Sequence, residues 1–222
     1  MGWLTTSLNR SIGKKFVMAL TGSLLMLFLI IHLIGNLTLY GGREAFNGYV
    51  ETLEVVKPVV RVIEVILALI FIYHIFNGVR LWWENKKAKP DKYAINANKE
   101  ITTFSSRTTI VTGSIIFIFL VLHLSTFWYQ FNISGHPETG SFEFYDIVTY
   151  WFNQPVYSIV YIIAVLLLGF HLNHGFQSAF QTFGWNKKRY FPTIKLIGTI
   201  YALIISLGFA SIPIYFLLTG GK

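Results

Sequence analysis

The residues of this sequence best suited to chemistry are four histidines inside long apolar segments: His32, His74, His123 and His171. A histidine within hydrocarbon is costly unless its ring meets another polar side chain, water, a metal ion or haem iron. Each of these four therefore needs a partner, and the residues around them indicate a shared role.

Two pairs of matching motifs carry the histidines. Residues 21–33 read TGSLLMLFLIIHL and residues 112–124 read TGSIIFIFLVLHL, while HIFNG at 74–78 corresponds to HLNHG at 171–175. Similar apolar positions are expected of any two hydrophobic helices, but Thr, Gly, Ser and His recurring in register are not. The sequence therefore predicts an internal repeat, in which the first two helices correspond to the third and fourth.

Five apolar runs must position these motifs, at about 16–39, 61–83, 108–131, 156–180 and 194–218. Each is long enough to cross about 30 Å of hydrocarbon as a helix, and the first is too long for the core of a signal peptide. With 54% hydrophobic and only 13% charged residues, the composition is typical of a polytopic membrane protein. We predict an all-α membrane protein with residues 1–222 in a single transmembrane domain.

The distribution of charge predicts the orientation. The net charge of +8 is concentrated in residues 10–15, 80–107 and 187–195, whereas residues 132–154 contain no Lys or Arg. Basic connections stay in the cytoplasm, so we expect a multi-pass protein of the cell inner membrane with a cytoplasmic N-terminus, and no nucleic-acid partner. The absence of Cys excludes disulfides, thiolate metal sites and iron–sulfur clusters held by this chain.

This topology also sorts the histidines by depth. His32 and His123 lie about sixteen residues, or roughly 24 Å, from the inner edge of the membrane, and so form a pair in the outer half. His74 and His171 form a pair in the inner half. The two pairs are expected to lie roughly 10 Å apart along the membrane normal.

Two histidines from facing helices suit a haem. Zinc and copper sites usually have three or four clustered ligands, and no carboxylate or thiolate stands beside these histidines. A b-type haem with two axial imidazoles has no open position for oxygen and is suited to electron transfer. Gly78 and Gly175, each four residues after a histidine, would leave space for a porphyrin. Phe28 and Phe119 either line the space between two haems or simply pack in the bundle.

Polar groups near the inner side are candidates for the surroundings of a haem. Arg80, Arg107, Thr21 and Thr112 could bind haem propionates, although each also suits an interfacial anchor or a helix cap. His174 is an alternative to its neighbour as a ligand. We choose His171 because its H-x-x-x-G motif matches that of His74, and we expect His174 to meet a propionate or an inner quinone region.

These motifs resemble those of the cytochrome b membrane-anchor subunit of succinate:quinone oxidoreductases and fumarate reductases, in its five-helix, dihaem, single-chain branch. The resemblance rests on HLIGN at 32–36, YHIFNG at 73–78, SRTTIVTG at 106–113, FHLNHG at 170–175 and SAFQTFGW at 178–185. It covers the first four helices in order.

The resemblance implies two haem b groups. His32 and His123 would bind the iron of the outer haem, and His74 and His171 that of the inner one. It also implies partners on the cytoplasmic side, a flavoprotein subunit with the dicarboxylate site and an iron–sulfur subunit. Electrons would pass between the iron–sulfur subunit and a membrane quinone, menaquinone rather than ubiquinone, as in respiratory complex II of the tricarboxylic acid cycle.

A quinone site near the outer haem needs a group that manages protons. The candidates are Asn36, Glu51, Glu54 and Glu64, each of which also suits a solvated outer connection. Two alternatives remain for the whole chain. One is a cytochrome b anchor of another quinone-linked dehydrogenase, and the other is a haem-free transporter that uses the histidines as a proton relay. The direction of catalysis and the oligomeric state of the complex stay open.

Overall fold

Five long helices make up most of the chain, as the sequence predicts. The structure, a computed structural model, describes residues 10–88, 104–134 and 143–221, with backbone alone at 104–107 and 134. In chain order the helices are α2 (Ser11–Leu37), η1 (Thr38–Gly41), α3 (Gly42–Val55), α4 (Lys57–Lys87), α6 (Phe104–His123), η2 (Leu124–Trp128), η3 (Gln130–Ser134), α7 (Phe144–Phe152), α8 (Pro155–Thr182) and α9 (Phe191–Thr219). These described segments contain no strand.

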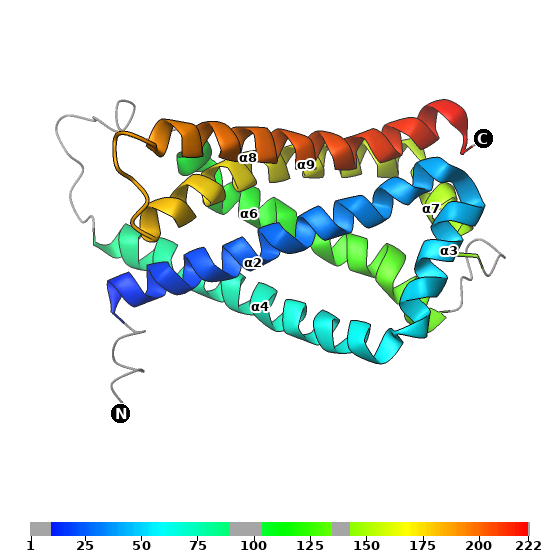
Figure 1. The fold of residues 1–222 in the computed structure, drawn as a ribbon, viewed down its shortest axis with the longest axis horizontal. Helices are drawn as coiled ribbons and strands as arrows, with labels where there is room; N and C mark the ends of the chain where they lie inside the picture. Colours follow the sequence, from blue (N-terminus) through cyan, green and yellow to red (C-terminus); the bar gives the residue numbers. More distant parts are fainter. Residues whose placement is uncertain (1–9, 89–103, 135–142, 222) are drawn as a thin grey trace.

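The long helices run side by side in an elongated bundle (Figure 1). Five segments, beginning at Ser11, Lys57, Thr108, Pro155 and Phe191, are long and apolar enough to cross a membrane. The first of them continues from α2 through η1 into α3. The fold is therefore that of a multi-pass α-helical membrane protein.

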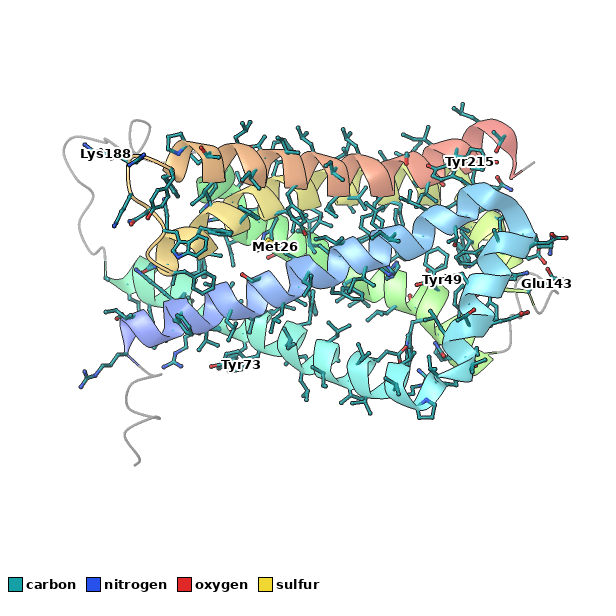
Figure 2. All side chains as sticks on the ribbon, in the orientation of Figure 1. Met26, Tyr49, Tyr73, Glu143, Lys188 and Tyr215 are labelled. Carbon is teal, nitrogen blue, oxygen red and sulfur yellow. The ribbon has the colours of Figure 1, made fainter. Side chains whose placement is uncertain are left out.

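The two ends of the bundle differ in the way that the charge pattern predicts. The start of α2 and the connection between α8 and α9 share one end, whereas α3, α7 and the C-terminus lie at the other (Figure 1). Figure 2 shows Lys188 at the first end and Glu143 at the second. We call these the inner and outer ends, following the predicted orientation. The described parts of the basic stretches, at 10–15, 80–87 and 187–195, belong to the start of α2, the end of α4 and the connection from α8 into α9, all at the inner end (Figure 1).

Helix α8 is the centre of the packing. It contacts α9 along its length and also packs on α6 and α2, while α4 rests mainly on α2. Small residues allow the closest of these approaches. A Cβ on Gly169 of α8 would lie only 2.9 Å from the Cβ of Ser206 on α9, so glycine is needed there for the two helices to meet.

The connections at the outer end are themselves helical, a feature that the sequence analysis did not foresee. Pro58 lies in the first turn of α4 and Pro155 opens α8, where a missing N–H costs nothing. The two connections are tied by Arg43 of α3, which donates hydrogen bonds to Glu143 and Asp146. These contacts link the connection between α2 and α4 to the connection between α6 and α8 at the outer end of the bundle.

The third span changes its winding directly after His123. The sequence predicts one helix over 108–131, but the α-helical ladder of α6 ends at His123 and two π-helical segments, η2 and η3, follow. A π-turn adds a residue to the turn and re-aims the side chains beyond it. The buried side chains of Thr126, Phe127 and Gln130 come from this stretch.

Candidate functional site

The structure brings the four predicted histidines together in two pairs. The rings of His32 on α2 and His123 on α6 lie 5.8 Å apart between centroids, and those of His74 on α4 and His171 on α8 lie 6.5 Å apart. The planes of each pair are steeply inclined, by 89° and 69°. Each of the four histidines therefore comes from a different helix.

Threonine hydroxyls hold the inner pair. Thr21 Oγ1 on α2 lies 3.2 Å from His74 Nδ1 on α4, and Thr112 Oγ1 on α6 lies 3.4 Å from His171 Nδ1 on α8. Both threonines are buried, 8% and 5% exposed, and a buried hydroxyl needs such a partner. The sequence analysis considered these threonines for haem propionates, and in the structure their oxygens lie beside the histidines.

The glycines that follow these threonines let the rings come close. A Cβ on Gly22 would lie 3.3 Å from His74 Cε1, and one on Gly113 would lie 3.4 Å from His171 Cε1. Each ring therefore rests directly against the backbone of the neighbouring helix. Each copy of the Thr-Gly motif therefore packs against an imidazole from the next membrane-spanning helix.

The outer pair has different partners. Tyr161 on α8 places its hydroxyl 3.2 Å from His123 Nδ1, and Asn36 places its amide nitrogen 3.4 Å from His32 Nδ1. The same amide donates a 2.8 Å hydrogen bond to the His32 carbonyl one turn earlier. All four Nδ1 atoms thus lie within 3.4 Å of a polar side-chain atom.

Aromatic side chains surround the outer pair. Phe28 stacks on His32, with centroids 5.1 Å apart and planes at 19°, and Phe119 packs edge-on against Tyr161 at 4.7 Å. Phe209 of α9 approaches His32 to 5.6 Å. The two repeated phenylalanines therefore contact the histidine on their own helix or its tyrosine partner, and the fifth helix contributes to the site as well.

The two glycines predicted to make room for a porphyrin differ in their surroundings. A Cβ on Gly78 would meet the terminal methyl group of Met18 at 3.3 Å, whereas one on Gly175 would have no heavy atom within 4 Å. His174, between the second glycine and His171, is half-buried, and it is the ring of His171 that pairs with His74.

Arg80 takes part in an ion-pair network at the inner end. Its Nε lies 3.1 Å from Glu84 Oε1, and the same carboxylate accepts from Lys14 of α2 at 2.7 Å. This network ties α4 to the start of α2. The side chain of Arg107, the other predicted propionate partner, lies outside the described residues.

Among the three glutamates of the quinone candidates, Glu64 is the least exposed. It is half-buried and pairs with Arg61 one turn earlier at 2.6 Å, and the indole of Trp128 donates to its Oε1 at 3.2 Å. Arg61 also donates to Asn132 Oδ1 and lies over the Trp128 ring. Glu64 therefore joins α4 to the π-helical stretch just beyond His123.

The other candidates for the quinone site have more ordinary surroundings. Glu51 is exposed on α3, and Glu54 is exposed and pairs with Lys57. Asn36 bonds to His32 as described above. The structure gathers Asn36 beside the outer histidines but gives the two α3 glutamates no contact with them.

Several residues of the site escaped the sequence analysis as partners of particular histidines: Thr21, Thr112, Tyr161, Gly22 and Gly113. The duplicated Thr-Gly-Ser motif was the available signal for four of them, because residues repeated in register outside the histidines themselves imply a shared contact. No comparable signal marked Tyr161, which has no counterpart in the repeat. In the described part of the chain, no three His, Cys, Asp or Glu side chains cluster as a metal site would require.

The class of this protein is a multi-pass membrane protein in which histidines from different helices lie in pairs inside the bundle. The chain belongs to the family described as the succinate dehydrogenase/fumarate reductase transmembrane subunit, whose profile matches residues 16–95 and 84–207. It is thus a multi-pass membrane subunit of a succinate or fumarate oxidoreductase complex, which implies soluble partner subunits. Searches of curated proteins and of solved structures found no match.

Proposed function

We propose that this subunit is a dihaem cytochrome b, which passes electrons between an iron–sulfur subunit on the cytoplasmic side and a quinone in the membrane. The observation that carries the proposal is the pairing of four histidine rings, two by two, in a chain of this family. Succinate chemistry would take place on another subunit, because this chain lies within the membrane.

The geometry of the pairs fits a haem. Two imidazoles that bind one metal ion from opposite sides, with metal–nitrogen bonds of about 2 Å, hold their ring centres roughly 6 Å apart. The observed separations of 5.8 Å and 6.5 Å lie on either side of this value. Two ligands per site, without a third His, Cys, Asp or Glu nearby in the described residues, suit a haem better than a zinc or copper ion.

The chain would hold the outer haem with His32 and His123 and the inner haem with His74 and His171. A b-type haem with two axial imidazoles exchanges one electron and leaves no position for oxygen. The protein holds the four rings from their Nδ1 sides and packs Phe28 and other aromatic side chains around the outer pair.

The quinone would react near the outer pair, with menaquinone preferred to ubiquinone by the family resemblance. Glu64 is the best placed candidate to manage its protons, since it is half-buried and is held by Arg61 and Trp128 beside the π-helical stretch that follows His123. Its neighbour Asn132 could share in binding a carbonyl oxygen.

The experiment is a reduced-minus-oxidised visible spectrum of the purified chain, with a measured haem-to-protein ratio. We expect two b-type haems per chain, one of which is lost in His32→Ala and the other in His171→Ala. His174→Ala is the matched control, because this histidine lies one turn from His171 without pairing with His74. It should keep both haems.

Two results would contradict the proposal. A colourless chain, with the fold retained as judged by its helical circular dichroism, would favour the histidine relay of a transporter. A chain that keeps its full haem content in both His32→Ala and His171→Ala would show that the pairs are not the ligands. Loss of a haem in His174→Ala, but not in His171→Ala, would move the inner site by one turn.

A further inference from the structure

The proposed function assigns no role to the repeated Thr-Gly motif. Each threonine lies on the membrane-spanning helix before that of its histidine, and each faces the Nδ1 atom of one ring of the inner pair. We propose that Thr21 and Thr112 are positioning residues, which accept a hydrogen bond from the Nδ1–H groups of His74 and His171 and thereby tune the reduction potential of the inner haem. This inference rests on the proposed function.

The direction of these hydrogen bonds follows from where the threonine hydrogens go. Thr21 Oγ1 lies 2.9 Å from the carbonyl oxygen of Val17 and 3.1 Å from that of Met18. A threonine in a helix commonly donates its single hydroxyl hydrogen to a carbonyl one turn earlier. With that hydrogen committed, the oxygen meets His74 Nδ1 as an acceptor, so Nδ1 carries the hydrogen of the neutral ring.

Thr112 repeats the arrangement. Its Oγ1 lies 3.1 Å from the carbonyl oxygens of both Thr108 and Thr109, and it is therefore also an acceptor towards His171. The Thr112 oxygen lies farther from its ring nitrogen than the Thr21 oxygen does, 3.4 Å against 3.2 Å, so we expect the effect at Thr21 to be larger.

The chemical consequence concerns the other ring nitrogen. When Nδ1–H donates to an acceptor, the tautomer is set, Nε2 keeps its lone pair for a metal, and the ring becomes a stronger electron donor. A stronger donor favours the ferric over the ferrous state of a bound iron and so lowers the reduction potential. Loss of the threonine hydroxyl should raise it.

The outer histidines make a natural internal reference. Their Nδ1 atoms face Tyr161 and Asn36 instead of a threonine, so a change at Thr21 should leave the outer haem unaffected. A shift in the potential of one haem alone would therefore indicate a local effect, because a general loosening of the bundle would affect both haems.

The test is a potentiometric titration of both haems in membranes that contain the intact complex, with three variants. Thr21→Val removes the hydroxyl at nearly constant volume, and Thr21→Ser restores it. Ser114→Ala is the control, because its hydroxyl donates to the Ile110 carbonyl as a helix hydroxyl should but is not one of the Nδ1 partners.

We expect Thr21→Val to keep both haems and to raise the potential of one of them. A tenfold change in the ferric–ferrous equilibrium corresponds to about 59 mV for a one-electron couple, and a ligand's hydrogen-bond partner typically acts on this scale. Thr21→Ser should return close to the original potential, and Ser114→Ala should not shift it. Thr112→Val should shift the same haem in the same direction by less.

Two results would overturn the inference while leaving the proposed function intact. One is two haems with unchanged potentials in Thr21→Val, and the other is a negative shift, which would mean that the hydroxyl donates to Nδ1. Loss of a haem from Thr21→Ser as well as from Thr21→Val would also overturn it, since the residue would then serve only packing. Absence of haem from the unsubstituted complex would instead refute the proposed function.

Discussion

Substitution of Gly169 by alanine tests the packing of the two helices that make the longest contact, α8 and α9. The new Cβ would lie 2.8 Å from Ser206 Oγ and 2.9 Å from its Cβ, and real Cβ atoms essentially never approach so closely. Since Ser206 is itself buried in α9, with its hydroxyl bonded to the Ala202 carbonyl at 2.7 Å, one helix has to move.

The expected loss follows from two opposing effects. Overpacking of a close contact costs about 1–3 kcal/mol, while alanine regains up to about 1 kcal/mol of helix propensity over glycine. The free energy of unfolding should therefore fall by about 1–2 kcal/mol. For a chain of this size, that lowers the melting temperature by roughly 2–8 °C.

The assay is thermal unfolding of the purified chain in detergent, followed by circular dichroism. Gly48→Ala is the control, because a Cβ there would meet no heavy atom within 4 Å and the residue also lies inside a helix, α3. This control should be as stable as the original chain or slightly more so.

A double substitution separates the contact from general effects of alanine in α8. Ser206→Gly removes the side chain that the new Cβ would strike, so Gly169→Ala combined with Ser206→Gly should recover at least about 1 kcal/mol relative to the sum of the two single changes. A stability of Gly169→Ala equal to that of the original chain, or strictly additive changes in the double variant, would refute the packing argument.

Two further substitutions address the inner and outer ends. Asn77→Leu should lower the free energy of unfolding by about 1 kcal/mol in the same thermal assay. The reason is that the buried Asn77 amide on α4 donates a 2.9 Å hydrogen bond to the Lys14 carbonyl of α2. An unchanged melting temperature would show that this bond contributes nothing. Glu64→Gln should slow quinone-linked turnover at least tenfold with both haems retained, whereas the exposed Glu51→Gln should not; equal rates in the two variants would exclude Glu64 from the proton path.

The number of the spans could be predicted from sequence because hydrocarbon imposes strong local constraints. Five apolar runs and three basic stretches sufficed to expect five helices and the depth of each histidine. The fold confirms the five helices. The apolar runs did not predict that the two outer connections contain the helices α3 and α7.

The geometry of the pairs had to come from tertiary structure. Depth along the membrane indicated that His32 could meet His123, but the rotation of each helix about its axis decides which ring faces which. The same holds for His171, which pairs with His74 in preference to its neighbour His174. Rotation depends on close contacts among many side chains, and no single segment encodes it.

The sequence by itself determined the membrane class, the matched histidines and the duplicated Thr-Gly-Ser motif, because hydropathy, charge and repetition are properties of residues along the chain. Only the tertiary structure decided what that motif does. It showed Thr21 against His74 and Thr112 against His171, with Tyr161 in the corresponding role at His123. A hydrogen bond between helices depends on distances of a few ångströms across the bundle, which are set when the helices pack and are absent from any linear pattern.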